Sequence, residues 1–262
     1  MEDAHANITD RDGILTVTIN RPAKLNAISP QVTEAFWTAT RAMMERDDLR
    51  CMVITAVGKY FTAGIDLAAS AERLENTPKD SARPGWNYRR GYREHHLLYD
   101  EFENLEKPIV LAAQGICLGA GVEMAMSCDF RFCTPKTEWA LPEINLGVLP
   151  GSGGSSRLTR LVGPAWAKYM AMAGMRISAE RALAIGLTHE VFPEETFMDD
   201  VYSFCRQLCE LPAEAVGMAK LDIDMTTDVQ DRTVQRHIDR LVNTVLVNSE
   251  EHKKRIARFK KK

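Results

Sequence analysis

Two glutamates lie within apolar sequence rather than on a charged face. Glu123 follows the glycine-bearing turn LGAG, and Glu143 follows Leu141 and Pro142. Burying an unpaired carboxylate is costly, so such a group usually either shifts its pKa or finds a partner. Two carboxylates at the ends of apolar elements indicate acid–base chemistry, for which proton transfer at the carbon next to a carbonyl is a natural candidate.

Two glycine-containing turns, FTAGIDL (61–67) and LGAGVE (118–123), accompany this pair of acids. Each turn is expected to follow a strand and to leave backbone N–H groups pointing into a cleft. The second turn also opens a helix, whose N-terminal partial positive charge favours an anion. Two converging N–H donors would form an oxyanion hole that stabilises an enolate or a tetrahedral oxyanion.

Several other site classes are excluded by the sequence. The glycines at 119 and 121 begin a dinucleotide-like pattern, but Met124 breaks it, and Gly58-Lys59 lacks the glycines of a phosphate loop. Neither GxSxG nor HExxH is present. Cys205 and Cys209 lie one helical turn apart without further ligands nearby, so no metal site is expected.

Composition predicts an ordinary globular protein. The 262 residues are 45% hydrophobic and carry a formal charge of −3, which does not indicate binding to nucleic acid or to an anionic membrane. The polar, acidic N-terminus MEDAHANITD is not expected to act as a signal peptide, and the apolar run 109–122 is too short to span a bilayer. The six cysteines follow no disulfide framework, which predicts reduced thiols and a cytoplasmic location.

The first two-thirds of the chain alternates strand and helix signals, typical of an α/β fold. We expect a hairpin over 7–21, and a helix over 30–46 with Ser29 as N-cap and Pro30 at its first position. A polar loop is expected over 68–85 and a helix over 86–106, whose stripe of aromatic residues forms either a core face or the lining of a substrate tail pocket. Further strands are predicted at 51–57, 109–113, 129–133 and 138–141, with a helix at 119–127 and a glycine-rich loop at 147–154.

From Ser155 the chain is predicted to be helical, with one last short strand at 189–192. Two final helices are expected at 213–226 and 229–247. The second carries an apolar stripe of Val234, Ile238, Leu241 and Val245. Such a stripe packs either on another subunit or back on the protein's own core, and periodicity does not distinguish the two.

Five blocks of this sequence, in order, resemble the crotonase (enoyl-CoA hydratase/isomerase) superfamily over nearly the full length. They are NRPAKLNAIS (20–29), GKYFTAGIDL (58–67), KPIVLAAQGICLGAGVEMAMSCDFRF (107–132), LPEINLGVLPGSGGSSRLTRLVG (141–163) and ISAERALAIGLTHEVFP (177–193). The resemblance implies a spiral of ββα repeats over residues 1–195 that carries the acyl-CoA site. It also implies a helical oligomerisation region over 196–262, with assembly into a homotrimer or a hexamer of two trimers.

The resemblance also implies the roles of particular residues. The thioester carbonyl would lie between the backbone N–H groups of Ala63 and Ala120; the latter position is more often glycine in hydratases. Contacts to coenzyme A would come from Ala23, Lys24, Leu25, Ala63, Asp66 and Leu67, and from Phe259 and Lys262, the last two acting on a neighbouring subunit. Trp86 and Trp139 are expected to shape the acyl pocket. No metal or redox cofactor is implied, since coenzyme A is part of the substrate.

The presence of both acids favours an enoyl-CoA hydratase. Glu123 would deprotonate water that attacks C3 of a trans-2-enoyl-CoA, and Glu143 would protonate C2. The FTAGIDL block is close to dienoyl-CoA isomerases, the alternative, but that family has an aspartate at the Glu123 position and a further acid where Gly151 stands here. The basic tail HKKRIARFKKK (252–262) raises RNA binding as a third, less favoured function.

Overall fold

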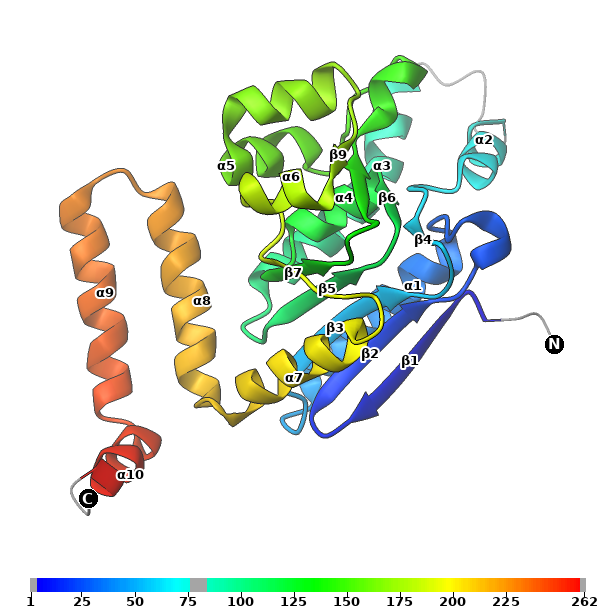
Figure 1. The fold of residues 1–262 in the computed structure, drawn as a ribbon. Helices are drawn as coiled ribbons and strands as arrows, with labels where there is room; N and C mark the ends of the chain where they lie inside the picture. The colour runs from blue at the N-terminus through cyan, green and yellow to red at the C-terminus, as the bar shows by residue number, and fades with distance from the viewer. Residues whose placement is uncertain (1–3, 76–83, 260–262) are drawn as a thin grey trace.

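The computed structural model describes the backbone of residues 4–75 and 84–259 and the side chains of residues 4–72 and 94–258. Within these residues the chain forms two β-sheets surrounded by helices (Figure 1). The larger sheet contains, in spatial order, β1 (Ala6–Arg11), β2 (Ile14–Ile19), β3 (Cys51–Ala56), β5 (Ile109–Ala113), β7 (Phe130–Cys133) and β10 (Glu190–Val191). The smaller sheet contains β4 (Tyr60–Thr62), β6 (Ile116–Leu118), β8 (Glu138–Ala140) and β9 (Ile177–Ser178).

The larger sheet is parallel except for the hairpin between β1 and β2. Asp12 and Gly13 turn this hairpin, both with positive φ. In β3 and β5 nearly every side chain is buried, which is why these strands read as continuous apolar runs rather than as alternating ones. The expected hairpin and buried strands are therefore confirmed.

The chain repeats one unit as it advances along the two sheets. β3 enters the larger sheet and β4 the smaller one; the pairs β5–β6 and β7–β8 repeat this step, and each pair is followed by helix. Parallel pairing of β4 with β6 and of β6 with β8 stacks the successive units. This is the spiral of ββα repeats that the sequence blocks imply.

The helices that pack on these units are α1 (Pro30–Glu45), α2 (Leu67–Glu75), α3 (Pro84–Asn104), α4 (Ala120–Met126), α5 (Gly154–Ala167) and α6 (Ala179–Ala184). The Oγ of Ser29 accepts the Val32 N–H and Pro30 occupies the first turn of α1, as predicted. Gly163 has non-helical φ and ψ and is followed by Pro164, so it interrupts α5. A π-helical turn (Lys168–Met172) follows.

The aromatic face of α3 belongs to the core where its side chains are described. Tyr99 and Phe102 are fully buried and pack in a cluster with Phe36 of α1, with the Phe36 and Phe102 rings edge to face. His95 is half-buried. The side chains of Tyr88 and Tyr92 lie outside the described residues, so the expected role of that part of the stripe stays a prediction.

The C-terminal part is helical: α7 (Phe197–Glu210), α8 (Ala213–Asp228), α9 (Arg232–Val247) and α10 (Glu250–Phe259). Phe197, Val201 and Cys205 of α7 are buried against the larger sheet in a second apolar cluster. By contrast, α8 and α9 form a helical pair that extends from the body of the protein (Figure 1). The boundary predicted at residue 195 stays a prediction: α7 packs on the sheet, and α8 is joined to the body through Lys220, whose Nζ donates to Phe102 O at 2.8 Å.

The polar segment beginning at residue 68 was expected to be a loop, which is wrong for its first part. Residues 67–75 form α2, whose start is capped by Asp66: its Oδ1 accepts the N–H groups of Ala68 and Ala69. Residues 76–83 lie outside the described residues. The strands β4, β6 and β9 were not predicted, because strands of two or three residues give no measurable periodicity. The helix α10 was not predicted either.

Candidate active site

Glu123 lies in the first turn of α4 and only 4% of its surface is exposed. Its Oε1 accepts two main-chain hydrogen bonds, from the N–H of Ser152 at 2.6 Å and from the N–H of Gly154 at 3.0 Å. Ser152 belongs to the glycine-rich turn before α5, and Gly154 is the first residue of that helix. A side chain on Gly154 would stand 2.8 Å from this oxygen, so the turn approaches the carboxylate closely because residue 154 is glycine.

Glu143 lies in the 3-10 turn Pro142–Leu146 and is partly buried. Its Oε2 is a buried oxygen without a hydrogen-bond partner among the described residues. A buried carboxylate oxygen in this state needs either a proton or a donor from a bound molecule. The structure therefore leaves one Glu143 oxygen available for chemistry.

Burial raises the pKa of both carboxyl groups. Burial, reinforced by the charge of Glu143, raises the pKa of Glu123 to about 7, while the Ser152 and Gly154 N–H groups and Arg157 act in the opposite direction. The pKa of Glu143 is also raised by burial. The two acids are thus electrostatically coupled, and at neutral pH Glu123 is poised between its protonated and ionised forms.

The backbone N–H of Ala120 is free for a ligand. It opens α4, and no hydrogen-bond partner for it is found among the described residues. The preceding Gly119 N–H, in contrast, donates to Ala140 O at 2.9 Å. Ala120 is therefore placed as expected for one donor of an oxyanion hole.

The expectation that Ala63 supplies the second donor is wrong. Its N–H donates to Leu25 O at 2.9 Å, and the Gly64 N–H donates to Thr62 Oγ1 at 3.1 Å. Within the described chain, the N–H of Ile65 has no partner. Gly64 has a φ of +93° and turns the chain between these residues, so the free N–H is displaced two positions from the predicted one.

The two turns meet at Gly64. A β-carbon on this glycine would lie 3.1 Å from Leu118 O and 3.6 Å from the Ala120 nitrogen. Only a glycine allows the FTAGIDL turn to come this close to the start of α4. Ile65 and Ala120 consequently offer two unpaired N–H groups from adjoining turns, one of which lies three residues before Glu123.

The residues expected to bind coenzyme A differ in how accessible they are to a ligand. Ala23 and Lys24 are exposed in the 3-10 turn Pro22–Lys24, and Leu25 follows it with a φ of +52°. Leu67 is 57% exposed at the start of α2, whereas the Asp66 carboxylate is engaged by Arg21 at 3.0 Å. The main chain of Asp66 is also engaged, since its N–H donates to Ile28 O and its carbonyl accepts the Ser70 N–H, so its predicted contact with coenzyme A stays a prediction.

One of the two acyl-pocket tryptophans is misassigned. Trp139 is fully buried in the main hydrophobic core, so it lines no accessible surface. Trp86 lies in α3 and Phe259 ends α10, but their side chains are outside the described residues, as is all of Lys262. Their predicted roles stay predictions.

Asn26 is a supporting residue that the sequence reasoning did not single out. It is fully buried with a φ of +55°, and its Nδ2 donates to Val57 O and Tyr60 O, both at 2.7 Å. Its Oδ1 accepts the Arg21 N–H at 2.8 Å. Its position within the NRPAKLNAIS block was the one feature of the sequence that could have indicated this role.

Tyr99 also supports the site, since its hydroxyl donates to Ala120 O at 3.0 Å. This bond ties the middle of α3 to the first residue of α4. The apolar stripe of α3 had predicted only that Tyr99 faces inward.

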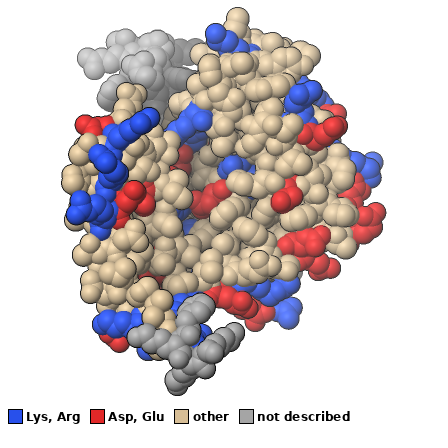
Figure 2. Space-filling view, turned by 60° about the vertical axis from the view of Figure 1, so that its left-hand side comes forward, with Lys and Arg blue, Asp and Glu red and all other residues tan. Residues whose placement is uncertain are grey.

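Two hollows on the described surface lie apart from Glu123 and Glu143. A hollow of about 700 Å³ beyond the ends of β3 and β5 contains neither glutamate. In the described part of the chain, no group of three or more metal-ligating side chains and no helix suited to crossing a membrane are found. On the face seen in Figure 2, basic and acidic side chains are interspersed.

Taken together, the fold is that of a crotonase-like protein and the site combines two coupled carboxyl groups with two free N–H donors. The model of the family described as enoyl-CoA hydratase/isomerase matches residues 9–262. The chain is 34% identical to a carnitinyl-CoA dehydratase of Salmonella arizonae over 229 residues, covering 87% of this chain and 82% of the relative. The same activity is named for a relative in Salmonella agona at 34% identity, covering 88% and 85%.

Solved structures agree with this assignment. An enoyl-CoA hydratase from Geobacillus kaustophilus HTA426 superposes with a TM-score of 0.88 at 28% identity, covering 100% of this chain and 96% of that one. An enoyl-CoA hydratase from Bacillus anthracis shares the fold with a TM-score of 0.89 at 24% identity, covering 98% and 96%. The protein belongs to the enoyl-CoA hydratase/isomerase family of the crotonase superfamily, and it is an enzyme of that family.

Proposed function

We propose that the protein is a hydro-lyase that adds water across the 2,3-double bond of a trans-2-enoyl-CoA thioester. The observation that carries this proposal is the pair of buried, coupled carboxyl groups, Glu123 and Glu143, beside the unpaired N–H groups of Ile65 and Ala120. Addition of water requires one ionised carboxylate to accept a proton and one protonated carboxyl group to donate a proton at the same pH. The raised pKa values of Glu123 and Glu143 bring both forms within reach near neutral pH.

The steps follow from these roles. The thioester oxygen accepts hydrogen bonds from the two N–H groups, which stabilise the enolate that forms as water attacks C3. Ionised Glu123 takes a proton from that water, and protonated Glu143 delivers its proton to C2. The free Glu143 oxygen and the doubly held Glu123 oxygen fit these roles, because the base is fixed in place while the acid has an oxygen left to donate from. No metal or redox cofactor takes part.

Dehydration, the reverse of the proposed reaction, also suggests substrates to test. Relatives at 34% identity are named carnitinyl-CoA dehydratase, which is loss of water from a hydroxyacyl-CoA. The same two acids serve both directions by microscopic reversibility. We therefore include carnitinyl-CoA among the substrates to be tested, beside simple enoyl-CoA thioesters.

Double-bond isomerisation is the alternative supported by the FTAGIDL block. It would also use an enolate and two proton transfers, but it would add no water. The acid that the isomerases carry after their PE motif is replaced by Gly151 in this chain. This absence favours hydration.

Oligomerisation would complete the site. Val234, Leu241 and Val245 of the predicted stripe on α9 are 44%, 69% and 51% exposed, so the protein's own core does not cover them. We propose that other copies cover this stripe in a homotrimer or a hexamer, with the C-terminal residues reaching a neighbour's coenzyme A. The six free cysteines suit a reducing, cytoplasmic environment.

The test is a substrate panel with product mass analysis. Enoyl-CoA thioesters of increasing chain length should lose their enone absorbance and gain the mass of one water, and carnitinyl-CoA is assayed for the reverse change. Glu123→Gln and Glu143→Gln should each lower turnover by at least about 10²-fold. Activity should rise with pH through about 7 as Glu123 ionises. A product of unchanged mass would favour isomerisation, and equal turnover by wild type and Glu143→Gln would remove the hydratase proposal.

A further inference from the structure

Arg157 lies directly behind the turn that holds Glu123. It projects from α5 and is only 5% exposed. Its Nη1 donates to Ser152 O at 3.0 Å. The N–H of the same Ser152 donates to Glu123 Oε1, so one residue separates the arginine from the catalytic acid.

The guanidinium also restricts the centre of this turn. Gly153 has a φ of +92°, and a β-carbon there would overlap Arg157 Nη1. The turn is therefore packed against the arginine, with its two N–H donors directed at Glu123. Because Arg157 binds the Ser152 carbonyl and packs on Gly153, it keeps the two N–H donors in place during the reaction.

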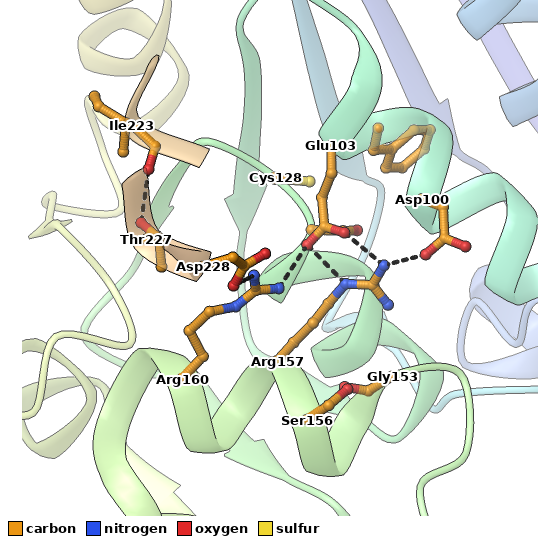
Figure 3. A network of polar contacts seen from close by, with 12 residues as sticks. Asp100, Glu103, Cys128, Gly153, Ser156, Arg157, Arg160, Ile223, Thr227 and Asp228 are labelled. Atoms are coloured by element: carbon orange, nitrogen blue, oxygen red, sulfur yellow. Dashed lines mark hydrogen bonds and ion pairs between the residues drawn. The ribbon is translucent and has the colours of Figure 1, made fainter. Parts of the chain in front are cut away.

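Two carboxylates of α3 hold the arginine from the other side (Figure 3). Glu103 accepts from Nε at 2.8 Å and from Nη2 at 2.7 Å, and Asp100 accepts from Nη2 at 2.6 Å. This bidentate geometry fixes the plane of the guanidinium. Glu103 also pairs with Arg160 at 3.6 Å, and Arg160 pairs with Asp228 at the end of α8.

We propose that Arg157 is the positioning residue for Glu123, holding the turn 152–154 against its carboxylate, and that Glu103 and Asp100 balance the charge of the arginine. This inference rests on the proposed role of Glu123 as the base in hydration. Arg157 itself touches no reacting atom.

The balance of charges has a direct electrostatic consequence. The charged or titratable groups that face Glu123 are Glu143 from the 3-10 turn, Arg157 from α5 and the neutral phenol of Tyr99 from α3. An arginine without its carboxylate partners would stabilise ionised Glu123 strongly and make it a weaker base. With Glu103 and Asp100 beside it, the arginine holds the turn without abolishing the raised pKa of Glu123.

Opposite changes to the charge should therefore move the titration of Glu123 in opposite directions. Arg157→Met removes a cation, so the pKa of Glu123 and the acidic limb of the pH–rate profile should move upward by about one unit. Glu103→Gln removes an anion, so both should move downward. We expect kcat of Arg157→Met to fall by about tenfold or more with KM nearly unchanged, and Arg157→Lys to recover part of the loss.

Arg131 provides a matched control. It is also an arginine at 5% exposure, and it donates to Leu187 O and Cys128 O without touching the turn that holds Glu123. Arg131→Met should lower the melting temperature while leaving the titration of Glu123 in place. A purely structural role of Arg157 would make the Arg157 and Arg131 variants behave alike.

The experiment measures pH–rate profiles of the full-length enzyme together with infrared titration of its carboxyl groups. The signal of Glu123 is isolated by subtracting, for wild type and for each variant, the spectrum of the same protein carrying Glu123→Gln. Shifts of opposite sign in Arg157→Met and Glu103→Gln support the inference. Shifts in the same direction, or none, overturn it. The infrared titration needs no turnover, so it decides the matter even if no hydration is found. If Arg157→Met does not fold, the downward shift expected for Glu103→Gln carries the test alone, and an upward shift or none overturns the inference.

Discussion

The carboxylate of Glu143 lies over the α-carbon of Gly119, so that a β-carbon on this glycine would stand 2.8 Å from Glu143 Oε1. Gly119 has φ of +54° and ψ of −122°, a conformation that side chains rarely adopt. Its N–H bond to Ala140 O places it at the junction of β6 and α4. One glycine thus lets an acid from one ββα unit approach the N-terminus of the helix that carries the other acid.

Gly119→Ala should therefore displace Glu143 as well as strain the backbone. We expect a loss of about 1–3 kcal/mol in the free energy of unfolding from the conformation alone. Turnover should fall by at least about tenfold, because the proton donor moves away from the start of α4. Gly186→Ala is the control: its φ is +80°, but a β-carbon there meets nothing within 4 Å. If the two variants have equal turnover, the close approach of Glu143 to Gly119 has no catalytic importance.

Burial of Glu123 should make stability depend on pH. Its pKa is raised from 4.5 to about 7 on folding, so the folded protein binds more protons than the unfolded chain between these values. The contribution of Glu123 to stability is therefore fully present below pH 4.5 and is lost as pH rises to about 7, by up to about 3 kcal/mol. In Glu123→Gln this decrease is absent.

Urea unfolding at a series of pH values, at one protein concentration, measures this effect. The free energy of unfolding of Glu123→Gln minus that of wild type should increase by about 3 kcal/mol from acid to neutral pH. Glu45→Gln, at an exposed position of α1, is measured alongside as the reference variant. A flat difference for Glu123→Gln would mean that its carboxyl is not buried as the structure describes.

The fold was predictable from sequence where long elements or capping residues gave a signal. Ser29 and Pro30 mark the start of α1, and the apolar runs of β3 and β5 indicate strands buried on both faces. Both glutamates were identified because an acid in apolar surroundings is unusual. The short strands β4 and β6 were missed, although they position both glycine turns, because their pairing is set by tertiary contacts.

The second N–H donor was placed wrongly for a related reason. Ala63 and Ile65 flank Gly64, and which N–H is free depends on the partners that each finds in space. Ala63 meets Leu25 O, a residue far away in the sequence. Trp139 was assigned to the acyl pocket, yet it is in the core, because its position in a strand does not reveal which face of the sheet is covered. Arg157 could not be recognised, since its role depends on a turn, two carboxylates and Glu123 coming together.

The corrected donor can be tested by removing its hydrogen. Ile65→Pro abolishes the N–H, whereas Ile65→Val keeps it and changes the side chain by one methyl group. We expect Ile65→Pro to lower kcat by about 10²–10³-fold, as for loss of one oxyanion-hole donor, and Ile65→Val to remain near wild type. Thermal melting of both variants shows whether the proline also disturbs folding. Full turnover by a folded Ile65→Pro enzyme would show that the Ile65 N–H is not the second donor of the oxyanion hole.

Asn26 gives a prediction about the scaffold rather than the chemistry. Its Nδ2 group donates to Val57 O and Tyr60 O, so it joins the NRPAKLNAIS block to the two ends of the connection between β3 and β4. Asn26→Asp replaces a group that donates twice by an oxygen facing two carbonyl oxygens in a fully buried position. Leaving buried acceptors unpaired and burying a charge should lower the free energy of unfolding by about 3 kcal/mol or more.

The matched control for this substitution is Asn243→Asp. Asn243 is exposed on α9, and its Nδ2 donates to a single carbonyl, Asp239 O at 2.9 Å. Water can replace that bond, so a change within about 0.5 kcal/mol is expected. Urea unfolding of both variants at neutral pH makes the comparison. Because the segment that Asn26 anchors leads through β4 to Ile65, Asn26→Asp should also weaken turnover in whatever fraction stays folded. Equal stability of the two variants would show that the buried amide is not what holds this segment in place.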